Sequence, residues 1–139
     1  MISKKTLYGL EAVILLAKRQ NDTPALITDL AKEGHIPKKF LEGILLELRK
    51  AGILHSKKGK GGGYALAKNA QDISVGDVIR ILEGSFSDID VEESNQELSE
   101  IKLIIKEVRN AMSNILDKTT IADVIERACC GQNILNYVI

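Results

Sequence analysis

The stretch that decides the fold is Ser56 to Tyr64, which reads SKKGKGGGY. It lies between two short β-prone segments, Ile53–His55 and Tyr64–Ala67, and glycines supply the positive φ angles that a hairpin tip needs. The loop mixes three lysines with four glycines: Lys57, Lys58, Lys60, Gly59, Gly61, Gly62 and Gly63. A thin cationic hairpin can enter a DNA groove and neutralise phosphates, so the stretch predicts the wing of a winged helix.

Two nucleotide-binding loops are rival interpretations of these glycines, and both fail on their spacing. A phosphate-binding loop needs Gly-Lys followed by Ser or Thr at the start of a helix, but Gly61 follows Lys60 here. The dinucleotide fingerprint fails because Tyr64 stands where its last glycine belongs. A flexible surface hairpin with incidental lysines remains as the alternative.

Length and composition favour one domain, or one small domain with an appended assembly element. The chain has 139 residues, of which 45% are hydrophobic, and this fraction is enough for a core. The longest apolar run, residues 12–17, is too short to span a bilayer. Lys4 and Lys5 precede an apolar stretch, but Glu11 interrupts it, which argues against a secretory signal. We therefore expect a cytoplasmic protein that does not bind a membrane.

The formal net charge of zero conceals a strong asymmetry along the chain. Residues 1–68 hold 13 of the 19 basic residues and 6 of the 19 acidic residues, a surplus of 7 positive charges. Residues 69–139 hold the other 6 basic and 13 acidic residues and carry the opposite surplus. This sorting predicts an anionic partner for the first half.

Apolar periodicity predicts three helices before the wing, at about Thr6–Arg19, Ala25–Glu33 and Pro37–Ala51. Pro24 suits the first turn of the second helix, and Gly34 suits its C-terminal stop. The inward positions on the three helices are Leu7, Leu10, Val13, Ile14 and Ala17, then Leu26, Ile27 and Leu30, then Phe40, Leu41, Ile44, Leu45 and Leu48. The last two helices, joined by a three-residue turn, match a helix-turn-helix, whose second helix meets DNA with its N-terminal residues.

After the wing, Ser74 is expected to cap a helix over Val75–Glu83, which Gly84 ends. An acidic linker over residues 85–94 follows, so a domain boundary is predicted near Gly84. The predicted division is 1–84, a winged helix-turn-helix DNA-binding domain, then the linker 85–94, then 95–139, a dimerisation helix with a C-terminal helix and tail. The fold class is mainly α (α+β), with a small β-hairpin wing and a long C-terminal dimerisation helix.

The long helix is expected at about Asn95–Leu116. Its apolar residues are spaced alternately three and four apart: Leu98, Ile101, Ile105, Val108, Met112 and Ile115. Such a seam favours a partner helix and hence a homodimer, although packing back onto the chain's own first helix is the alternative. Thr120 can cap a final short helix over 121–128.

Cys129 and Cys130 are the only cysteines, and neighbours in sequence cannot form an ordinary unstrained disulfide. Together with His35 and His55 they give no ligand spacing typical of zinc, so no metal site is predicted. Two interpretations of the cysteines stay open: small residues at the end of a helix, or a redox-sensitive or modifiable thiol pair.

Three segments together resemble the bacterial Rrf-two (Rrf2) type transcription regulators. Residues 36–54 resemble the recognition helix of that family, residues 56–64 its glycine-rich wing, and residues 73–84 its helix after the wing. The resemblance implies a homodimer that binds a partly palindromic operator on double-stranded DNA, usually as a repressor. By position, it places recognition contacts on Lys38, Lys39, Phe40 and Glu42 and wing contacts on Lys58 and Lys60. On electrostatic grounds, Lys57, Lys4 and Lys5 are further phosphate partners.

This chain departs from the family pattern at several positions. Phe40 stands where the family usually has Tyr, Lys58 replaces a usual Arg, and Lys60 replaces a usual Pro. Cluster-binding members carry three cysteines before the long helix, whereas residues 84–98 contain none. Because iron–sulfur clusters generally need such thiolates, no cofactor is predicted. The effector, a small molecule or a protein, is not identified by the sequence.

The leading hypothesis is therefore a dimeric, sequence-specific DNA-binding repressor. The alternative is a winged-helix module that serves as a protein–protein adaptor through its acidic second half. An enzyme is disfavoured because the chain has no Ser-His-Asp set, no metal spacing and no convincing carboxylate pair.

Overall fold

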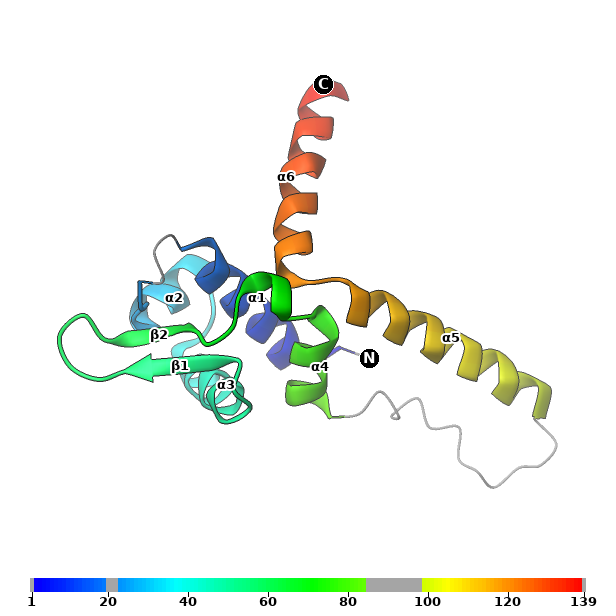
Figure 1. The fold of residues 1–139 in the computed structure, drawn as a ribbon, viewed down its shortest axis with the longest axis horizontal. Coiled ribbons are helices and arrows are strands. Elements are labelled where there is room, and N and C mark those ends of the chain that lie inside the picture. Colours follow the sequence, from blue (N-terminus) through cyan, green and yellow to red (C-terminus); the bar gives the residue numbers. More distant parts are fainter. Residues whose placement is uncertain (1, 20–22, 85–98, 139) are drawn as a thin grey trace.

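The computed structural model describes the backbone of residues 2–19, 23–84 and 99–138, and side chains up to Cys130 except Ser99. Its elements follow the order three helices, two strands, a short 3-10 helix and three more helices (Figure 1). This order confirms the predicted winged helix-turn-helix with a long helix behind it. Within the described residues, no helix is both long and apolar enough for a membrane span.

The helix-turn-helix consists of α2 (Ile27–Gly34) and α3 (Lys38–Lys50), and α1 (Lys4–Lys18) packs against both. The turn between α2 and α3 begins at His35, which takes the left-handed conformation with φ of 51°. The predicted stop at Gly34 is thus displaced by one residue. Pro37 is the N-cap of α3, where its missing N–H costs no intrahelical bond.

The wing is formed by β1 (Leu54–Lys57) and β2 (Gly63–Leu66), which pair antiparallel with Leu54 opposite Leu66. Ala25 forms an isolated antiparallel bridge with Tyr64 of β2, in which the two residues exchange backbone hydrogen bonds of 2.8 Å. The prediction that α2 starts at Ala25 is therefore wrong by two residues. Pairing with β2 holds Ala25 extended, and a helix cannot begin until that pairing ends.

After the wing, η2 (Ala70–Asp72) leads into α4 (Val75–Glu83), and the predicted cap at Ser74 is confirmed. The Ser74 hydroxyl accepts from the Asp77 N–H at 3.0 Å, and the Asp77 carboxylate accepts from the Ser74 N–H at 3.2 Å. This reciprocal arrangement is a capping box, which satisfies two backbone donors that a helix start leaves free.

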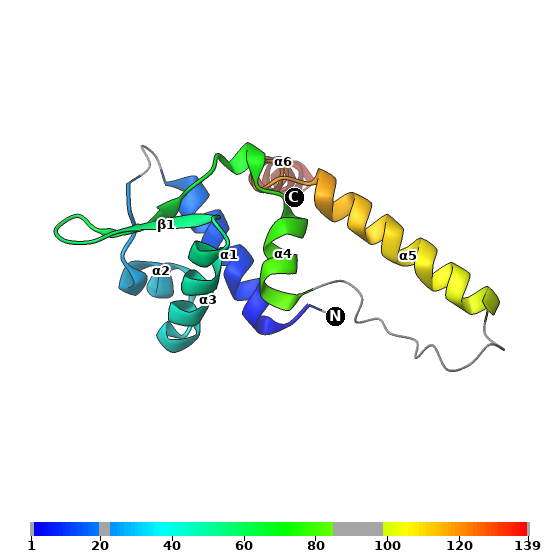
Figure 2. The ribbon, with the colours of Figure 1, turned by 60° about the horizontal axis from the view of Figure 1, so that its bottom comes forward.

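The C-terminal helices α5 (Ser99–Lys118) and α6 (Ile121–Val138) extend in different directions from the winged-helix body (Figures 1 and 2). Thr120 caps α6 in the same reciprocal way as Ser74 caps α4, with Asp123 as its partner at 3.0 Å in both directions. The expectation that α6 ends near residue 128 is wrong, because the backbone stays helical to Val138. Gly131 does not end the helix, since one glycine inside a helix costs only about 1 kcal/mol.

The core lies between α1, α3, α4 and the base of the wing. Its largest fully buried apolar side chains are Leu30, Leu41, Ile44, Leu45, Leu48, Leu54, Ile73, Ile79, Ile121, Val13 and Val78. Ile121 joins this core although it lies beyond the predicted boundary near Gly84. The division into 1–84, 85–94 and 95–139 stays a prediction, and residues 85–98 lie outside the described residues.

Three of the predicted inward positions are wrong. Leu7 is 53% exposed, Leu26 55% and Phe40 59%. On α1 the buried stripe includes the predicted Val13, together with Ala12 and Leu16, which were not predicted. Leu26 precedes α2 as its extended N-cap, so its side chain does not follow the helical face.

Candidate nucleic-acid interface

The N-terminal turns of α3 present charged and aromatic side chains to solvent. Lys38, Lys39 and Glu42 are exposed, whereas the next residues along the inner face, Leu41 and Ile44, are buried to within 1%. The buried residues fix the rotation of α3 about its own axis. The helix therefore exposes Lys38, Lys39, Phe40 and Glu42, and the DNA contacts that the family resemblance gives to these residues stay a prediction.

Phe40 was also expected in the core, and the structure contradicts that expectation. Its ring lies at the edge of the buried stripe of α3 and meets the Tyr8 ring of α1, with centroids 6.4 Å apart and planes inclined by 56°. Such a tilted pair is a favourable aromatic geometry. Tyr8 is partly buried against the core, so it supports one side of the exposed Phe40 ring.

Farther along the outer face of α3, sequence reasoning missed two features. At Gly43 the space that a Cβ would enter is open to 4 Å, so the backbone of α3 lies bare at this point. Arg49, one helical repeat of seven residues after Glu42, donates from its guanidinium to the Ser56 hydroxyl at 3.3 Å. This bond places a planar cation where α3 meets the wing. Residues seven apart lie on the same face of a helix, so the spacing from Glu42 could have predicted that Arg49 lies on the outer face.

The wing keeps Lys57, Lys58 and Lys60 exposed around a turn that requires glycine. Gly59 and Gly61 have φ of 96° and 74°, a region that residues with a Cβ rarely adopt. A Cβ on Gly62 would collide with the carbonyl oxygen of Lys57. The glycines thus fold the tip tightly while the three lysines remain in solvent.

The N-terminal end of α1 lies beside α3, and its two lysines differ in their surroundings. Lys4 is exposed, whereas the Lys5 ammonium pairs with the Glu47 carboxylate of α3 at 2.9 Å. Both partners are about 40% exposed, and an ion pair of that kind contributes little stability. Lys5 therefore links α1 to α3, and its charge is already partly neutralised within the chain.

A carboxylate at the end of α4 holds the start of α1. Glu83 accepts hydrogen bonds from the Ser3 N–H and from the Thr6 hydroxyl, the latter at 2.8 Å. Hydrogen bonding from Ser3, through its side chain and its backbone, and then from Thr6 lowers the pKa of Glu83 to about 2. This contact fixes the segment that carries Lys4 and Lys5.

On α5, several apolar side chains remain in solvent. Ile101, Ile104, Val108 and Ile115 are between 49% and 62% exposed and lie along one stripe, called here the α5 stripe. Of the other predicted seam residues, Ile105 and Met112 are half-buried, and Leu98 lies outside the described residues. The predicted seam stays a prediction, and the most exposed apolar line runs through Ile104 rather than Ile105.

An ion pair and a backbone bridge tie α5 to the winged helix. The Arg80 guanidinium of α4 meets the Asp117 carboxylate at 2.6 Å, and the hydrogen bond between them lowers the pKa of Asp117 and raises that of Arg80. Ser74 and Thr120 form an antiparallel bridge, in which the Val75 N–H donates to the Thr119 carbonyl at 2.9 Å. The bases of α4, α5 and α6 therefore share one hydrogen-bonded junction.

Cys129 and Cys130 are free thiols on the exposed part of α6. Within the described ranges, no group of three or more His, Cys, Asp or Glu side chains could hold a metal ion. A redox role for the two thiols stays a prediction.

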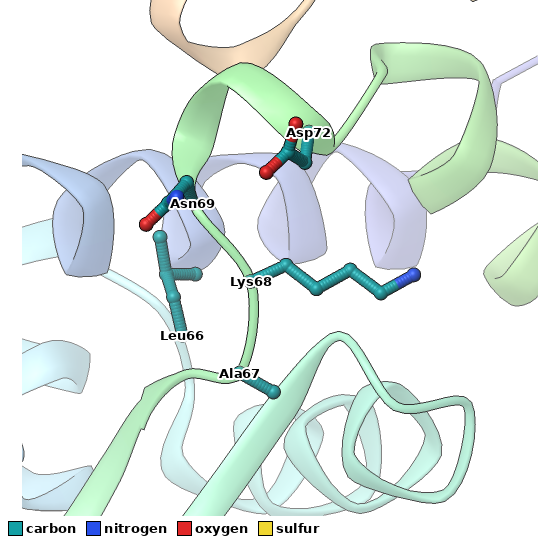
Figure 3. A pocket seen from close by; sticks show the side chains of 5 residues that line it. All are labelled: Leu66, Ala67, Lys68, Asn69 and Asp72. Carbon is teal, nitrogen blue, oxygen red and sulfur yellow. The ribbon is translucent and has the colours of Figure 1, made fainter.

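A shallow depression of about 540 Å³ lies between β2 and η2 (Figure 3). It is lined by Leu66, Ala67, Lys68, Asn69 and Asp72. Apart from Leu66, these residues are exposed, and in Figure 3 the Lys68 side chain extends across the depression. An open surface with one cation and one carboxylate assigns no ligand.

A helix-turn-helix with an exposed basic first turn and a lysine-bearing wing defines a class of DNA-binding regulators. Comparison with known proteins then gives the family: residues 2–127 match the Rrf2 family, described as iron-dependent transcriptional regulators, and the chain belongs to it. The chain is 37% identical over 123 residues to the regulator CymR of Bacillus subtilis, covering 88% of both chains. It is thus a DNA-binding transcription regulator from a family of regulators rather than of enzymes.

Solved structures agree with this assignment. The structure of CymR of B. subtilis, described as the global cysteine regulator of that organism, superposes with a TM-score of 0.81 at 35% identity, covering 91% of this chain and 97% of that one. IscR of T. potens superposes with a TM-score of 0.78 at 34% identity, covering 92% and 88%.

The family description mentions iron, but the donor atoms of this chain do not match what an iron site needs. An iron–sulfur cluster is generally held by cysteine thiolates that converge on one point. The two cysteines here are neighbours on an exposed helical segment, and residues 84–98 contain none. The described residues do not fit an iron site.

Proposed function

We propose that this protein represses transcription as a homodimer that binds a partly palindromic operator in the cytoplasm. The observation that carries the proposal is the outward face of α3, whose rotation is set by Leu41, Ile44, Leu45 and Leu48. With that face in the major groove, the wing reaches the neighbouring backbone or minor groove. Lys38, Lys39, Lys58 and Lys60 then lie where phosphates and base edges are found.

The experiment is a fluorescence-anisotropy titration with a duplex from upstream of the protein's own gene and a random duplex of equal length. Six exposed lysines per protomer are proposed phosphate partners: Lys4, Lys38, Lys39, Lys57, Lys58 and Lys60. If each neutralises one phosphate, log K falls with log salt at a slope of about −5 per half-site. No preference over the random duplex, or a salt-independent affinity, would refute sequence-specific binding.

The same titration separates the regulator from an adaptor. Replacing Lys38, Lys39, Lys58 and Lys60 with alanine removes charge from the proposed interface without touching the core. We expect the quadruple variant to lose DNA affinity, whereas an adaptor working through its acidic half would be unaffected.

The dimer is proposed to form through the α5 stripe. Its four residues leave roughly half of their surface in water, and burying the exposed half of such a side chain stabilises an interface by about 1 kcal/mol. A partner helix on this stripe would bury all four side chains. When the α5 helices of two protomers pair, the resulting dimer carries two recognition helices.

Light scattering with matched variants tests this interface. Ile104→Asp places a charge in the stripe and should reduce the mass from twice 15.2 kDa to 15.2 kDa. Leu103→Asp is the matched control, because Leu103 is equally exposed, at 65%, but faces another side of α5. A monomeric wild type, or equal loss of dimer in both variants, would contradict the proposed interface.

A further inference from the structure

The exposed ring of Phe40 is the least expected feature of the proposed interface. It is 59% exposed on the first turn of α3, although a residue of this size gains by burial and the core lies one residue away at Leu41. Lysines at positions 38 and 39 precede it, and Glu42 follows at the next exposed position. An apolar ring beside two lysines suits a surface that is apolar at one point and carries anionic groups nearby.

The major groove of DNA is such a surface. Most groups that base pairs present there are hydrogen-bond donors and acceptors, and the C5-methyl group of thymine is the apolar exception. A phenylalanine has no hydrogen-bonding atom, so it gains nothing from the polar edges. The surrounding lysines complement the phosphates that flank the groove.

We propose that Phe40 reads the C5-methyl group of a thymine in each operator half-site. This inference rests on the proposed function, because it needs the first turn of α3 to lie in the major groove. Phe40 makes the contact itself. It therefore determines specificity at one base pair, whereas the lysines around it act on all sequences alike.

Tyr8 is the positioning residue for this contact. Its ring meets that of Phe40 at 6.4 Å and is itself packed against the core. The ion pair between Lys5 and Glu47 also joins α1 to α3, one helical turn before Tyr8. With one side supported by Tyr8, the Phe40 ring does not have to be ordered when DNA binds, and its free side faces outward.

The test replaces thymine by deoxyuridine, which removes only the methyl group. Each thymine of a bound operator is replaced in turn, symmetrically in both half-sites, and the dissociation constant is measured at fixed salt. One position should lose about fourfold per half-site, because burying a methyl-sized group contributes about 0.8 kcal/mol. The variant Phe40→Ala should bind the thymine and deoxyuridine duplexes with equal affinity. The variant Tyr8→Ala should reduce the ratio of the two dissociation constants, and Tyr8→Phe should restore that ratio to its wild-type value.

The salt dependence of DNA affinity in Phe40→Ala distinguishes a lost methyl contact from a general loss of structure. A general loss of structure would change this dependence, whereas loss of the methyl contact alone would not. Phe40→Ala carries the same charge as the wild type, so its slope of log K against log salt should be unchanged. If the wild type prefers its operator but no deoxyuridine substitution alters affinity, the methyl contact is wrong and the proposed function stands. The same holds if Phe40→Ala keeps the thymine preference. If the wild type shows no operator preference, the proposed function fails, and this inference fails with it.

Discussion

Replacing Lys58 and Lys60 with alanine tests whether the wing binds phosphate. Both side chains are exposed at a turn whose shape is set by glycines, so their loss leaves the hairpin ladder between β1 and β2 intact. In a dimer, the double variant removes four cations from the interface. If each neutralises one phosphate, the slope of log K against log salt becomes shallower by about 3.6.

The consequence for affinity is large and depends on salt. Over a fourfold rise in salt, from about 50 to about 200 mM, a slope difference of this size changes the ratio of the two affinities by roughly 150-fold. The variant should therefore bind far more weakly than the wild type at low salt and approach it at high salt. Anisotropy titrations of both proteins at four or five salt concentrations give the two slopes directly.

A matched control uses two lysines that lie away from the proposed interface. Lys106 and Lys118 are exposed on α5, so replacing both with alanine changes the net charge by the same amount. We expect this control to keep the wild-type slope. Equal slopes for wild type and the Lys58/Lys60 variant, or an equal shift in the control, would refute a wing that contacts phosphate.

Three further predictions concern folding. The pKa of Glu83 is about 2 in the folded chain against 4.5 ordinarily, so its hydrogen bonds stabilise the fold above pH 4.5, and this contribution is lost as pH falls toward 2. The urea midpoint of the wild type should therefore fall between pH 4.5 and 2, and Glu83→Gln should make that fall smaller. The same pH profile in both proteins would contradict this prediction. Ser74→Ala removes a cap and should lower the free energy of unfolding by about 1 kcal/mol in urea titrations. An unchanged urea midpoint would show that the cap does not stabilise the fold. Gly63→Ala should destabilise more, because Gly63 has φ of 141° and a Cβ there would collide with the backbone of Ala25; a thermal midpoint equal to that of the wild type would argue against this packing.

The parts that sequence predicted well depend on neighbours along the chain. The Ser74 cap and the exact bounds of α4 followed from a local capping signal, and the structure confirms both. The start of α2 did not follow, because Ala25 pairs with Tyr64, which lies far along the chain. Long-range pairing overrides a local helix signal, and no periodicity reveals it.

The candidate site shows the same limit. The wing lysines were predicted from composition, and Lys38 and Lys39 were placed at the DNA by the family resemblance. Phe40 received two conflicting predictions, because the resemblance gave it a DNA contact whereas apolar periodicity assigned it to the core. A periodic pattern defines an arc of the helix, and residues at its edge can face either way. The position of α1 decides the outcome, since Tyr8 meets the Phe40 ring without covering it.

The hydrogen-bonded junction connects the proposed DNA-binding surface with the proposed dimer interface. The N-caps Ser74 and Thr120 pair with one another, and Arg80 of α4 holds Asp117 near the end of α5. Because α4 packs against α1 and α3, the direction of α5 relative to the recognition helix is set by these contacts and not by the chain between them alone. In a dimer that pairs through the α5 stripe, the junction therefore sets the distance between the two recognition helices. Half-sites one helical turn of DNA apart, about 34–36 Å, are the spacing that such a fixed separation has to match.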